Sequence, residues 1–532
     1  MLSLSLASCA GSPLAEDPPS PSDPSPGTVL PSESELPPGA RVLYVSARGD
    51  DSNDGATPER ALRSPARALS LARDGTGDRV LLRRGDRWEL EAPLRVEVSG
   101  ASERAPFVLG VHGGGDARAT LATRGEHGLE LVGRDAMRGL EHVRIEGLAL
   151  EEQRSVESVG DGVSEGVHLV APDGATATAR DVTLEDVSIR GYGVGLSALG
   201  TNTTEGVREL RLHHVLVLDT HHARNAIGLL FSRVRGLELD EIVVDRVQRD
   251  GRAPSVFDHS VYIQTDCEDV HVRGSVFARA PDGVMQRAGG VLEDNLIVDV
   301  AIGALEGYVF GGAVPTPGGV TFRVERNVFL DLGDLSPELG RGIGLYAGNV
   351  RSGVVSQNLV ARSRAASPWS SWAFAVMGET NDGNIGVRDL AIVHNEVRDM
   401  PMLVRVAGTA LETVRFEDNL VVLRPGPLPA LSLDRELPLV FLRTRGALGD
   451  RLQVGPTQVP LAPWLAQHGE ALVPDDAARP LRDVAAYHAS IGGRPSLEAF
   501  LEAVRAQSGH GWRASLGGRA ASAWIRDTTA AR

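Results

Sequence analysis

The chain has 532 residues and a net charge of −16, and all 54 of its basic residues are arginine. This acidic balance argues against nucleic acid as a partner, and the lack of lysine excludes any mechanism that uses a lysine base. Glycine supplies 61 residues and aromatic side chains only 4%, which favours many short strands joined by tight turns over a helical enzyme. Two cysteines, Cys9 and Cys267, provide no disulfide framework.

The first 40 residues are expected to export and tether the chain. Leu6-Ala7-Ser8-Cys9 resembles the lipobox of bacterial lipoproteins, in which the cysteine is lipidated. A secretory signal needs an apolar stretch of about 7 to 15 residues before this motif, and only eight residues precede Cys9, so we expect the true start to lie upstream. Residues 10–40 are rich in proline, serine and acidic residues and are predicted to be a disordered linker.

We therefore expect an exported lipoprotein of the outer membrane or cell surface, with a secreted or periplasmic protein as the alternative. The alanine after Cys9 favours the outer membrane by resemblance to Gram-negative lipoproteins. No later stretch is long and apolar enough to span a membrane, so the lipid anchor is its only expected attachment.

Residues 43–88 are expected to form a strand, an acidic loop, a helix and a first coil of strand. Ser64 followed by Pro65 predicts where the helix starts. A helix here would cover the unpaired edge of that coil. Four residues of the loop offer oxygen ligands of the kind that Ca²⁺ binds, although a solvated turn is the favoured interpretation: Asp50, Asp51, Asn53 and Asp54.

Ten short runs between residues 143 and 421 recur every 20 to 39 residues, and within each run apolar and polar residues alternate. This period of two predicts half-buried strands. A second series of apolar runs lies between them. Five of the runs carry asparagine at the same place, where we expect a left-handed bend and a ladder of side chains stacked from coil to coil: Asn295, Asn327, Asn358, Asn395 and Asn419.

This repeat resembles the right-handed parallel β-helix of the pectate-lyase-like superfamily. The expected fold class is thus all-β: a solenoid over residues 41–435 with an N-terminal capping helix, followed by a helical appendage over residues 436–532. Leu497, Phe500, Leu501 and Val504 lie at helical spacing in that appendage. In the superfamily, polysaccharides lie along one sheet face bordered by longer loops, so the resemblance implies a polysaccharide partner. The chain is expected to be monomeric.

The candidate site lies in residues 258–287. If Val261, Ile263, Val284 and Ile343 point into the core, alternation turns their neighbours outward, and glycines 195, 228 and 344 would form a groove floor. Seven residues in or near this stretch are candidates for substrate binding: Asp258, Gln264, Gln286, Tyr346, His221, His222 and Arg224.

Three of the site residues can supply the groups needed for elimination across a uronic acid. The reaction needs a base for the C5 proton, a neutraliser for the carboxylate and an acid for the leaving oxygen. His259 is the candidate base, Arg287 the neutraliser and Tyr262 the acid. Family lyases commonly use a lysine or arginine base with Ca²⁺, and this chain has no lysine. Ca²⁺ is a conceivable cofactor that the residues do not indicate.

Two other functions remain open. Glycoside hydrolysis needs two carboxylates at a fixed gap, and the candidates are Asp258, Asp266, Asp282 and Glu306, although the clustered aspartates of polygalacturonases are missing. The alternation of the strand turns the Glu306 side chain toward the core, which predicts either a buried partner such as an arginine or a shift in strand register at this point. The third hypothesis is a cell-surface β-helix that binds glycans, or acts as a spacer, without turnover.

Overall fold

The structure is a computed structural model that describes residues 35–134, 139–153, 163–171, 178–200, 206–311, 313–334, 341–366, 370–437, 439–468 and 480–527. Cys9, the lipobox-like residues 1–9 and most of the linker at 10–40 lie outside the described residues. Within the described part, no helix has the length and apolarity needed to cross a membrane.

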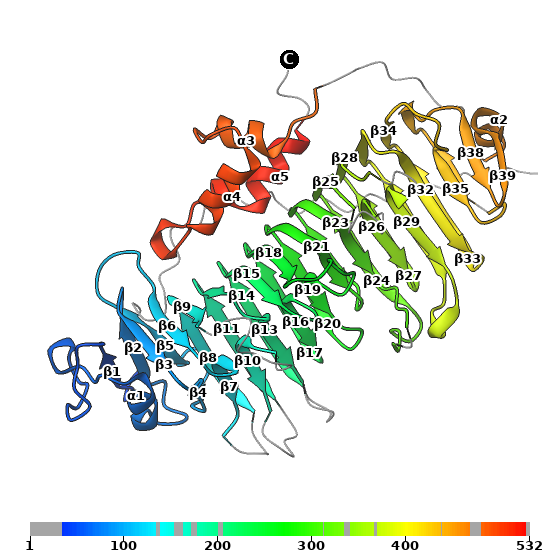
Figure 1. The fold of residues 1–532 in the computed structure, drawn as a ribbon. Helices are drawn as coiled ribbons and strands as arrows, with labels where there is room; N and C mark the ends of the chain where they lie inside the picture. The colour runs from blue at the N-terminus through cyan, green and yellow to red at the C-terminus, as the bar shows by residue number, and fades with distance from the viewer. Residues whose placement is uncertain are drawn as a thin grey trace, which may run out of the picture.

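Parallel strands stacked coil upon coil make up the body of the protein (Figure 1). The first column of strands is β1 Val42–Val45, β2 Arg79–Arg83, β5 Phe107–His112, β8 Leu140–Glu146, β11 Ala179–Glu185, β14 Val207–His213, β17 Val234–Asp240, β20 Glu268–Arg273, β22 Gly290–Glu293, β24 Val320–Glu325, β27 Val350–Ser356, β30 Val387–Val393, β33 Leu411–Glu417 and β36 Leu439–Leu442.

Two further columns complete each coil. The second column is β3 Arg87–Leu90, β6 Ala119–Thr123, β9 Leu148–Glu152, β12 Ser188–Arg190, β15 Leu216–His222, β18 Val243–Arg249, β25 Val328–Leu332, β28 Leu359–Ser363, β31 Glu396–Arg398, β34 Leu420–Val422 and β37 Arg445–Ala447. The third column is β4 Leu94–Val96, β7 His127–Val132, β10 Glu165–Val170, β13 Val194–Leu199, β16 Ile227–Ser232, β19 His259–Ile263, β26 Ile343–Gly348, β29 Trp372–Gly378, β32 Met402–Gly408, β35 Leu431–Leu433 and β38 Arg451–Val454.

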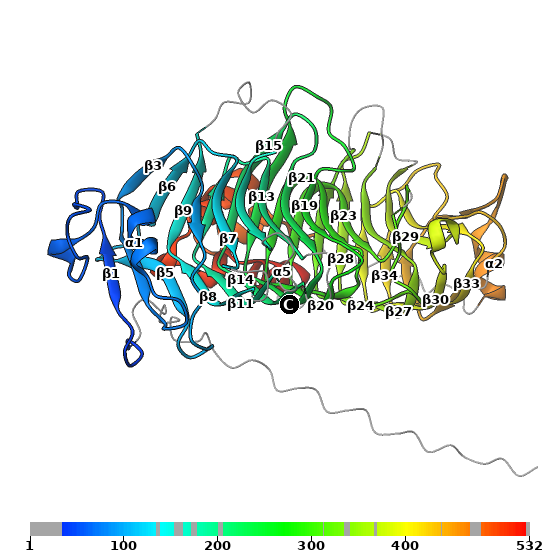
Figure 2. The same ribbon diagram turned by 90° about the horizontal axis from the view of Figure 1, so that it is seen from below.

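Two long strands, β21 Val276–Gln286 and β23 Leu296–Glu306, belong to both the second and the third column. Each strand pairs in parallel with its counterpart in the next coil, and the coils follow one another along a single axis (Figure 2). The all-β, right-handed parallel β-helix expected from the repeats is therefore confirmed, and inward-facing apolar residues fill it with one continuous core.

The asparagine ladder forms as expected, but its backbone differs from the expectation. Asn327 Nδ2 donates to Asn358 Oδ1 at 3.1 Å, and Asn358 Nδ2 donates to Asn395 Oδ1 at 3.0 Å. The left-handed conformation belongs to the residue before each asparagine, such as Arg326 with φ 56° and Gln357 with φ 55°. That residue makes the bend, and the asparagine that follows is turned inward to satisfy buried backbone groups.

Glycines in the third column face the core and do not form a groove floor, contrary to the expectation for Gly195, Gly228 and Gly344. A Cβ atom on Gly195 would lie 2.4 Å from Cγ1 of Val217, and one on Gly344 would lie 2.6 Å from Cγ1 of Val360. Both valines belong to the core. Glycine is needed because the second and third columns approach closely at this corner, where a side chain has no space.

We call the position of these core-facing glycines, near the start of each third-column strand, the glycine corner. It interrupts the alternation of inward-facing and outward-facing side chains, so the residue before the glycine faces outward. Ile343 precedes Gly344 and was expected in the core, but it packs with Ile302 and Ala375 in an outer cluster separate from the core. His259 holds the same place in β19, where Ser260 replaces the glycine. His259 accordingly lies on the outer face of the third column beside Tyr262, with ring centroids 4.7 Å apart.

Short helices cover both ends of the solenoid. At the N-terminal end, α1 Pro65–Leu71 begins at Ser64, whose side chain accepts a hydrogen bond from the backbone of Arg67, and Leu69 is buried in the core. The 3₁₀ helix η2 Pro58–Arg60 precedes it. At the other end, β39 Thr457–Pro460 pairs antiparallel with β38, and α2 Leu461–Gln467 buries Trp464 against the last coil.

The solenoid therefore continues beyond the expected boundary at residue 435. Strands β36, β37 and β38 all pair in parallel with the coil before them. Their short lengths explain the difference, because a run of three or four residues shows no clear alternation.

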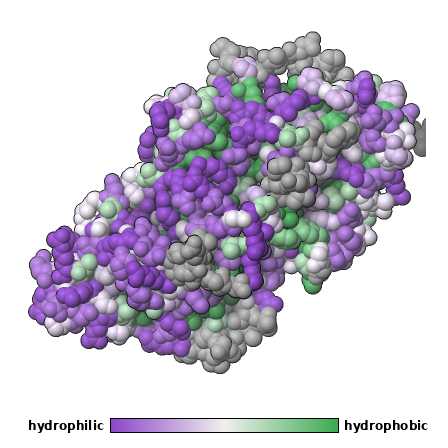
Figure 3. All heavy atoms as spheres, in the orientation of Figure 1, coloured by the Kyte–Doolittle hydropathy of each residue, from purple (hydrophilic) through white to green (hydrophobic). Residues whose placement is uncertain are grey.

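A separate helical unit comprises α3 Val484–Ser490, α4 Leu497–Arg505 and α5 Gly518–Arg526, with the 3₁₀ helices η6 Gly509–Gly511 and η7 Ala514–Leu516. It lies against the outer face of the second column (Figure 1). Phe500, Val504 and Ile525 form one apolar cluster with Leu218 and Val298 of the strands. The face of the molecule seen in Figure 3 is mostly hydrophilic, with hydrophobic residues in separate patches.

Candidate functional site

The predicted site lies on the outer face of the third column, where β19 and β21 are neighbours. The register pairs His259 with Asp282 and Tyr262 with Met285. Tyr262 and Met285 face outward, whereas Val261 belongs to the core. The pairing thus places an imidazole, a carboxyl group and a phenol side by side on two adjacent strands.

Arg287, directly after β21, is the charged centre of this group. Its guanidinium carbon lies 5.0 Å from the ring centroid of Tyr262 and 5.5 Å from that of Phe310. The side chain is only 5% exposed, and burial lowers its pKa. No carboxylate of the described residues forms an ion pair with it, and its Nε atom is buried without a hydrogen bond. A buried guanidinium held only by aromatic rings is incompletely compensated.

His259 and Asp282 form a buried pair beside the arginine. His259 Nδ1 lies 3.2 Å from Asp282 Oδ2, and both side chains are at most 3% exposed. Burial raises the pKa of Asp282, although the neighbouring imidazole opposes this effect. A carboxylate beside Nδ1 holds the ring in one orientation, with the other ring nitrogen directed away from Asp282.

An apolar and aromatic cluster continues the face toward the C-terminal coils. Met285, Leu305 and Met377 are buried there with Tyr308, and Tyr346 packs against them. Burial raises the pKa of Tyr346 above that of a free phenol. Tyr346 is therefore better suited to contact the face of a sugar ring than to donate a proton.

Loop 307–319, between β23 and β24, brings further residues over this face. Burial, and then the carboxylate of Glu379 at the Tyr308 hydroxyl, raise the pKa of Tyr308 to about 12. Phe310 lies above Arg287, with Phe257 of the loop before β19 at 6.4 Å between ring centroids. Phe257 is about half exposed. These loop residues were not predicted, although two aromatic residues so close together are notable in a chain that is 4% aromatic.

Gln286 and Asp258 were predicted to contact substrate, and the structure places them elsewhere. Gln286 is fully buried, in register with Ile263 and Glu306. Alternation explains this, since Gln286 stands between outward-facing residues 285 and 287. Asp258 is also fully buried, and its carboxylate accepts hydrogen bonds from the backbone of Ala226 and Ser255 and from Arg249. It anchors the loop before β19.

The remaining predicted residues lie around the edges of the site. Gln264 follows β19 on the outer face and is partly exposed. His221 Nδ1 lies 2.9 Å from Asp250, and His222 is buried with its Nδ1 accepting a hydrogen bond from the backbone of Arg224. Arg224 is exposed. These three belong to the corner one coil before His259, not to the centre.

Of the four carboxylates considered for hydrolysis, only Asp282 lies in the centre. Glu306 points into the core as its parity predicts, but it has no arginine partner and neither of its oxygens has a hydrogen bond within the described residues. Burial raises its pKa well above the ordinary value of a glutamate, which favours the neutral carboxyl group. Asp266 accepts hydrogen bonds from Ser232 and from the backbone of Arg233. This arrangement provides no pair of carboxylates facing each other across a gap.

The side chains of the four residues considered for Ca²⁺ form hydrogen bonds within the segment between β1 and α1. Asp50 accepts from Ser52, Asp51 from the backbone of Arg63 and Ser64, and Asp54 from the backbone of Ala56. The amide of Asn53 donates to the carbonyl oxygen of Ala61. Their oxygens act as turn caps.

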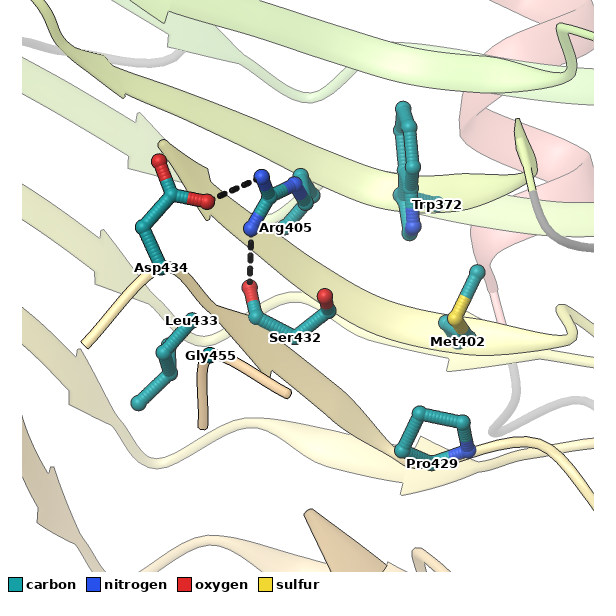
Figure 4. A pocket seen from close by; sticks show the side chains of 8 residues that line it. All are labelled: Trp372, Met402, Arg405, Pro429, Ser432, Leu433, Asp434 and Gly455. Atoms are coloured by element: carbon teal, nitrogen blue, oxygen red, sulfur yellow. Dashed lines mark hydrogen bonds and ion pairs between the residues drawn. The ribbon is translucent and has the colours of Figure 1, made fainter. Parts of the chain in front are cut away.

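A shallow pocket lies further along the same face, between β29, β32 and β35 (Figure 4). Arg405 points toward Asp434 and Ser432, and its guanidinium donates to the carbonyl oxygen of Ser432 at 3.3 Å (Figure 4). Trp372 lies on the neighbouring strand with a partly exposed indole ring. Trp372 is in register with Met402, three residues before Arg405, so the indole ring and the Arg405–Asp434 pair lie at opposite ends of the pocket (Figure 4). Indole rings can contact the faces of sugar rings, and arginine and aspartate can bind sugar hydroxyls.

No family model matches the sequence, and no curated protein matches it significantly. Among solved structures, the chain is similar to a mannuronic acid specific polysaccharide family 6 lyase enzyme from human gut microbiota, with TM-score 0.46, 15% identity and coverage of 92% of this chain and 100% of that chain. It is also similar to pectate lyase Pel9A, with TM-score 0.32, 12% identity and coverage of 79% and 82%.

A third solved structure is the GH136 lacto-N-biosidase from Eubacterium ramulus, with TM-score 0.37, 14% identity and coverage of 82% of this chain and 68% of that chain.

Proposed function

We propose that this chain binds a uronate-containing polysaccharide along the outer face of the third column and cleaves it by elimination. The observation that carries the proposal is the buried Arg287, which has two aromatic rings but no carboxylate among the described residues. An incompletely compensated buried cation is costly in free energy, and a uronate carboxylate would supply the missing anion. Arg287 would bind it through two parallel N–H donors.

The neighbours of Arg287 supply the base and the acid that elimination requires. His259, with Asp282 at Nδ1, accepts the C5 proton of the uronate at its other ring nitrogen. The electron pair left on C5 forms the C4–C5 double bond while the C4–O bond breaks. Tyr262 donates its phenolic proton to the departing oxygen, which becomes a hydroxyl group. Arg287 stabilises the negative charge that develops on the carboxylate in the transition state.

The apolar face begins at Met285 of β21 and continues to Leu305 and Tyr346 on the next two coils. The pocket at Trp372 and Arg405 lies on later coils of the same column. Together they extend the path of a chain of sugars beyond the cleavage point. A polysaccharide lying along the solenoid axis would meet one coil about every 4.8 Å, so several coils contact one oligosaccharide.

The test is to incubate the protein with a panel of acidic and neutral polysaccharides while recording unsaturated-uronate absorbance and new reducing ends. We expect both signals to rise together on a uronate-containing chain. Reducing ends without absorbance would overturn elimination in favour of hydrolysis. Binding of the polysaccharide without either signal would overturn catalysis and leave a glycan-binding protein.

We further propose that the protein is exported and anchored by a lipid on Cys9, on the basis of the lipobox-like sequence and the linker that follows it. The expected result is incorporation of labelled palmitate in the native host, abolished by Cys9→Ala. Labelling that persists in this variant would contradict the assignment of Cys9.

A further inference from the structure

A second group of polar residues lies on the third-column face, in the earlier coils β7 and β10 (Figure 1). One ligand atom each from His127, Glu165 and His168 lies within 4.8 Å of the other two. The two imidazole rings are stacked, with centroids 4.4 Å apart and an interplanar angle of 7°. All three side chains are between 15% and 19% exposed, so the group is shielded but accessible.

The glycine corner explains why these three side chains converge. Gly166 faces the core, where a Cβ atom would lie 2.2 Å from Cγ2 of Ile189. Glu165 before it and His168 after it therefore share the outer face, and Glu165 is in register with His127 of the preceding coil. The sequence separates His127 from Glu165 by 38 positions, so only the register brings them together.

The donor set matches a transition metal ion. His127 Nδ1 is buried and has no hydrogen bond within the described residues. His168 Nδ1 contacts Glu165 and lies 2.9 Å from Ser197 Oγ, which also donates to Glu165. Two imidazoles and one carboxylate bind Zn²⁺ and similar ions and leave a fourth position open, whereas Ca²⁺ and Mg²⁺ require oxygen ligands.

A second cluster of histidine and glutamate differs from the first in its hydrogen bonding. His214 Nδ1 lies 3.4 Å from Glu185 and its Nε2 lies 3.2 Å from Glu241, while His213 Nδ1 lies 2.9 Å from Glu185. Both ring nitrogens of His214 are thus already occupied by carboxylates. The unbonded Nδ1 of His127 distinguishes the first cluster.

We infer that His127, Glu165 and His168 form a binding site for one divalent transition metal ion, with Zn²⁺ as the best match. The site lies three to four coils before His259, a separation of about 14 to 19 Å at the usual strand spacing. The three side chains lie on the same outer face of the third column as Arg287. If the proposed function holds, the ion would bind a hydroxyl or carboxylate of the same polysaccharide, but metal binding itself does not depend on that function.

Calorimetric titration of the metal-stripped full chain with ZnCl₂, without polysaccharide, tests the inference. We expect one ion per chain, no comparable heat from CaCl₂ or MgCl₂, and at least a tenfold weaker Kd in His127→Gln and in His168→Gln. His271→Gln is the matched control, because His271 is exposed on the first column and belongs to neither cluster. It should bind Zn²⁺ like the unchanged chain.

Absence of saturable Zn²⁺ binding, or a Kd that neither cluster substitution changes, would overturn the inference. If the variants lose their circular dichroism, Co²⁺ bound to the unchanged chain provides a second measurement. Its visible spectrum should show low-symmetry, nitrogen-ligated Co²⁺, whereas the spectrum of hydrated Co²⁺ would contradict the site. Since no polysaccharide is present, these outcomes are independent of whether the chain is a lyase.

Discussion

His214 provides a pH-dependent clamp between the solenoid and the C-terminal helical unit. Its ring is stacked on that of Trp512 at 4.2 Å, and Trp512 Nε1 donates to Glu241. Burial alone would lower the pKa of His214, but the carboxylates of Glu185 and Glu241 outweigh it and raise the pKa to about 9. The protonated ring therefore holds both carboxylates and the indole in one network.

The expected magnitude follows from this pKa. Because the folded pKa lies above the ordinary 6.5, the stabilisation is fully present below pH 6.5 and is lost as the pH rises through 9. The difference corresponds to about 3 kcal/mol at 1.36 kcal/mol per pKa unit. The side chain is 18% exposed, so solvent screening reduces this value only in part.

Substitution His214→Gln, followed by hydrogen exchange of α4 and α5, measures the clamp. Comparing the variant with the unchanged chain at the same pH cancels the intrinsic exchange rate. At pH 6.5 we expect exchange in these helices to be faster by on the order of 100-fold, and at pH 9.5 only a small difference. His271→Gln should exchange normally at both values. Equal exchange at pH 6.5, or an undiminished difference at pH 9.5, would refute the reasoning.

Two further predictions concern groups in the core. Glu306→Gln should stabilise the chain against urea at pH 7. Because the pKa of Glu306 is raised in the folded chain, its carboxyl group ionises at lower pH in the unfolded chain, and the free energy of unfolding falls above pH 4.5. The stabilisation by Gln should therefore vanish at pH 4. No difference between the two pH values would contradict a neutral buried carboxyl group. Asn358→Ala should lower the free energy of unfolding by about 1–3 kcal/mol, because it leaves the buried amide of Asn327 and carbonyl of Val324 unbonded. Unchanged urea unfolding would show that the ladder contributes little.

The repeats carry enough information to predict the architecture, because alternation and the recurring asparagine report directly on burial and stacking. They do not determine which residue makes the bend. A left-handed conformation at Arg326 or Gln357 leaves no sign in residue type, since neither residue favours it intrinsically.

The candidate site could be predicted only in part. Alternation correctly turns Tyr262 outward, and the same rule should have placed Gln286 inside. The position of His259 depends on the glycine corner, which breaks strict alternation, and that of Phe310 depends on how loop 307–319 folds back. Neither is encoded in a local pattern. The pairing of His127 with Glu165 likewise arises from register between coils.

The most direct test of the central claim is the polysaccharide assay on Arg287→Gln and His259→Gln, with Arg323→Gln as an exposed control on the first column. Both site residues are buried, so a fold check by circular dichroism accompanies each variant. We predict that Arg287→Gln loses both binding and formation of unsaturated uronate. His259→Gln should lose only the product while still binding, and Arg323→Gln should behave as the unchanged chain. Undiminished product formation by folded Arg287→Gln and His259→Gln would contradict the account.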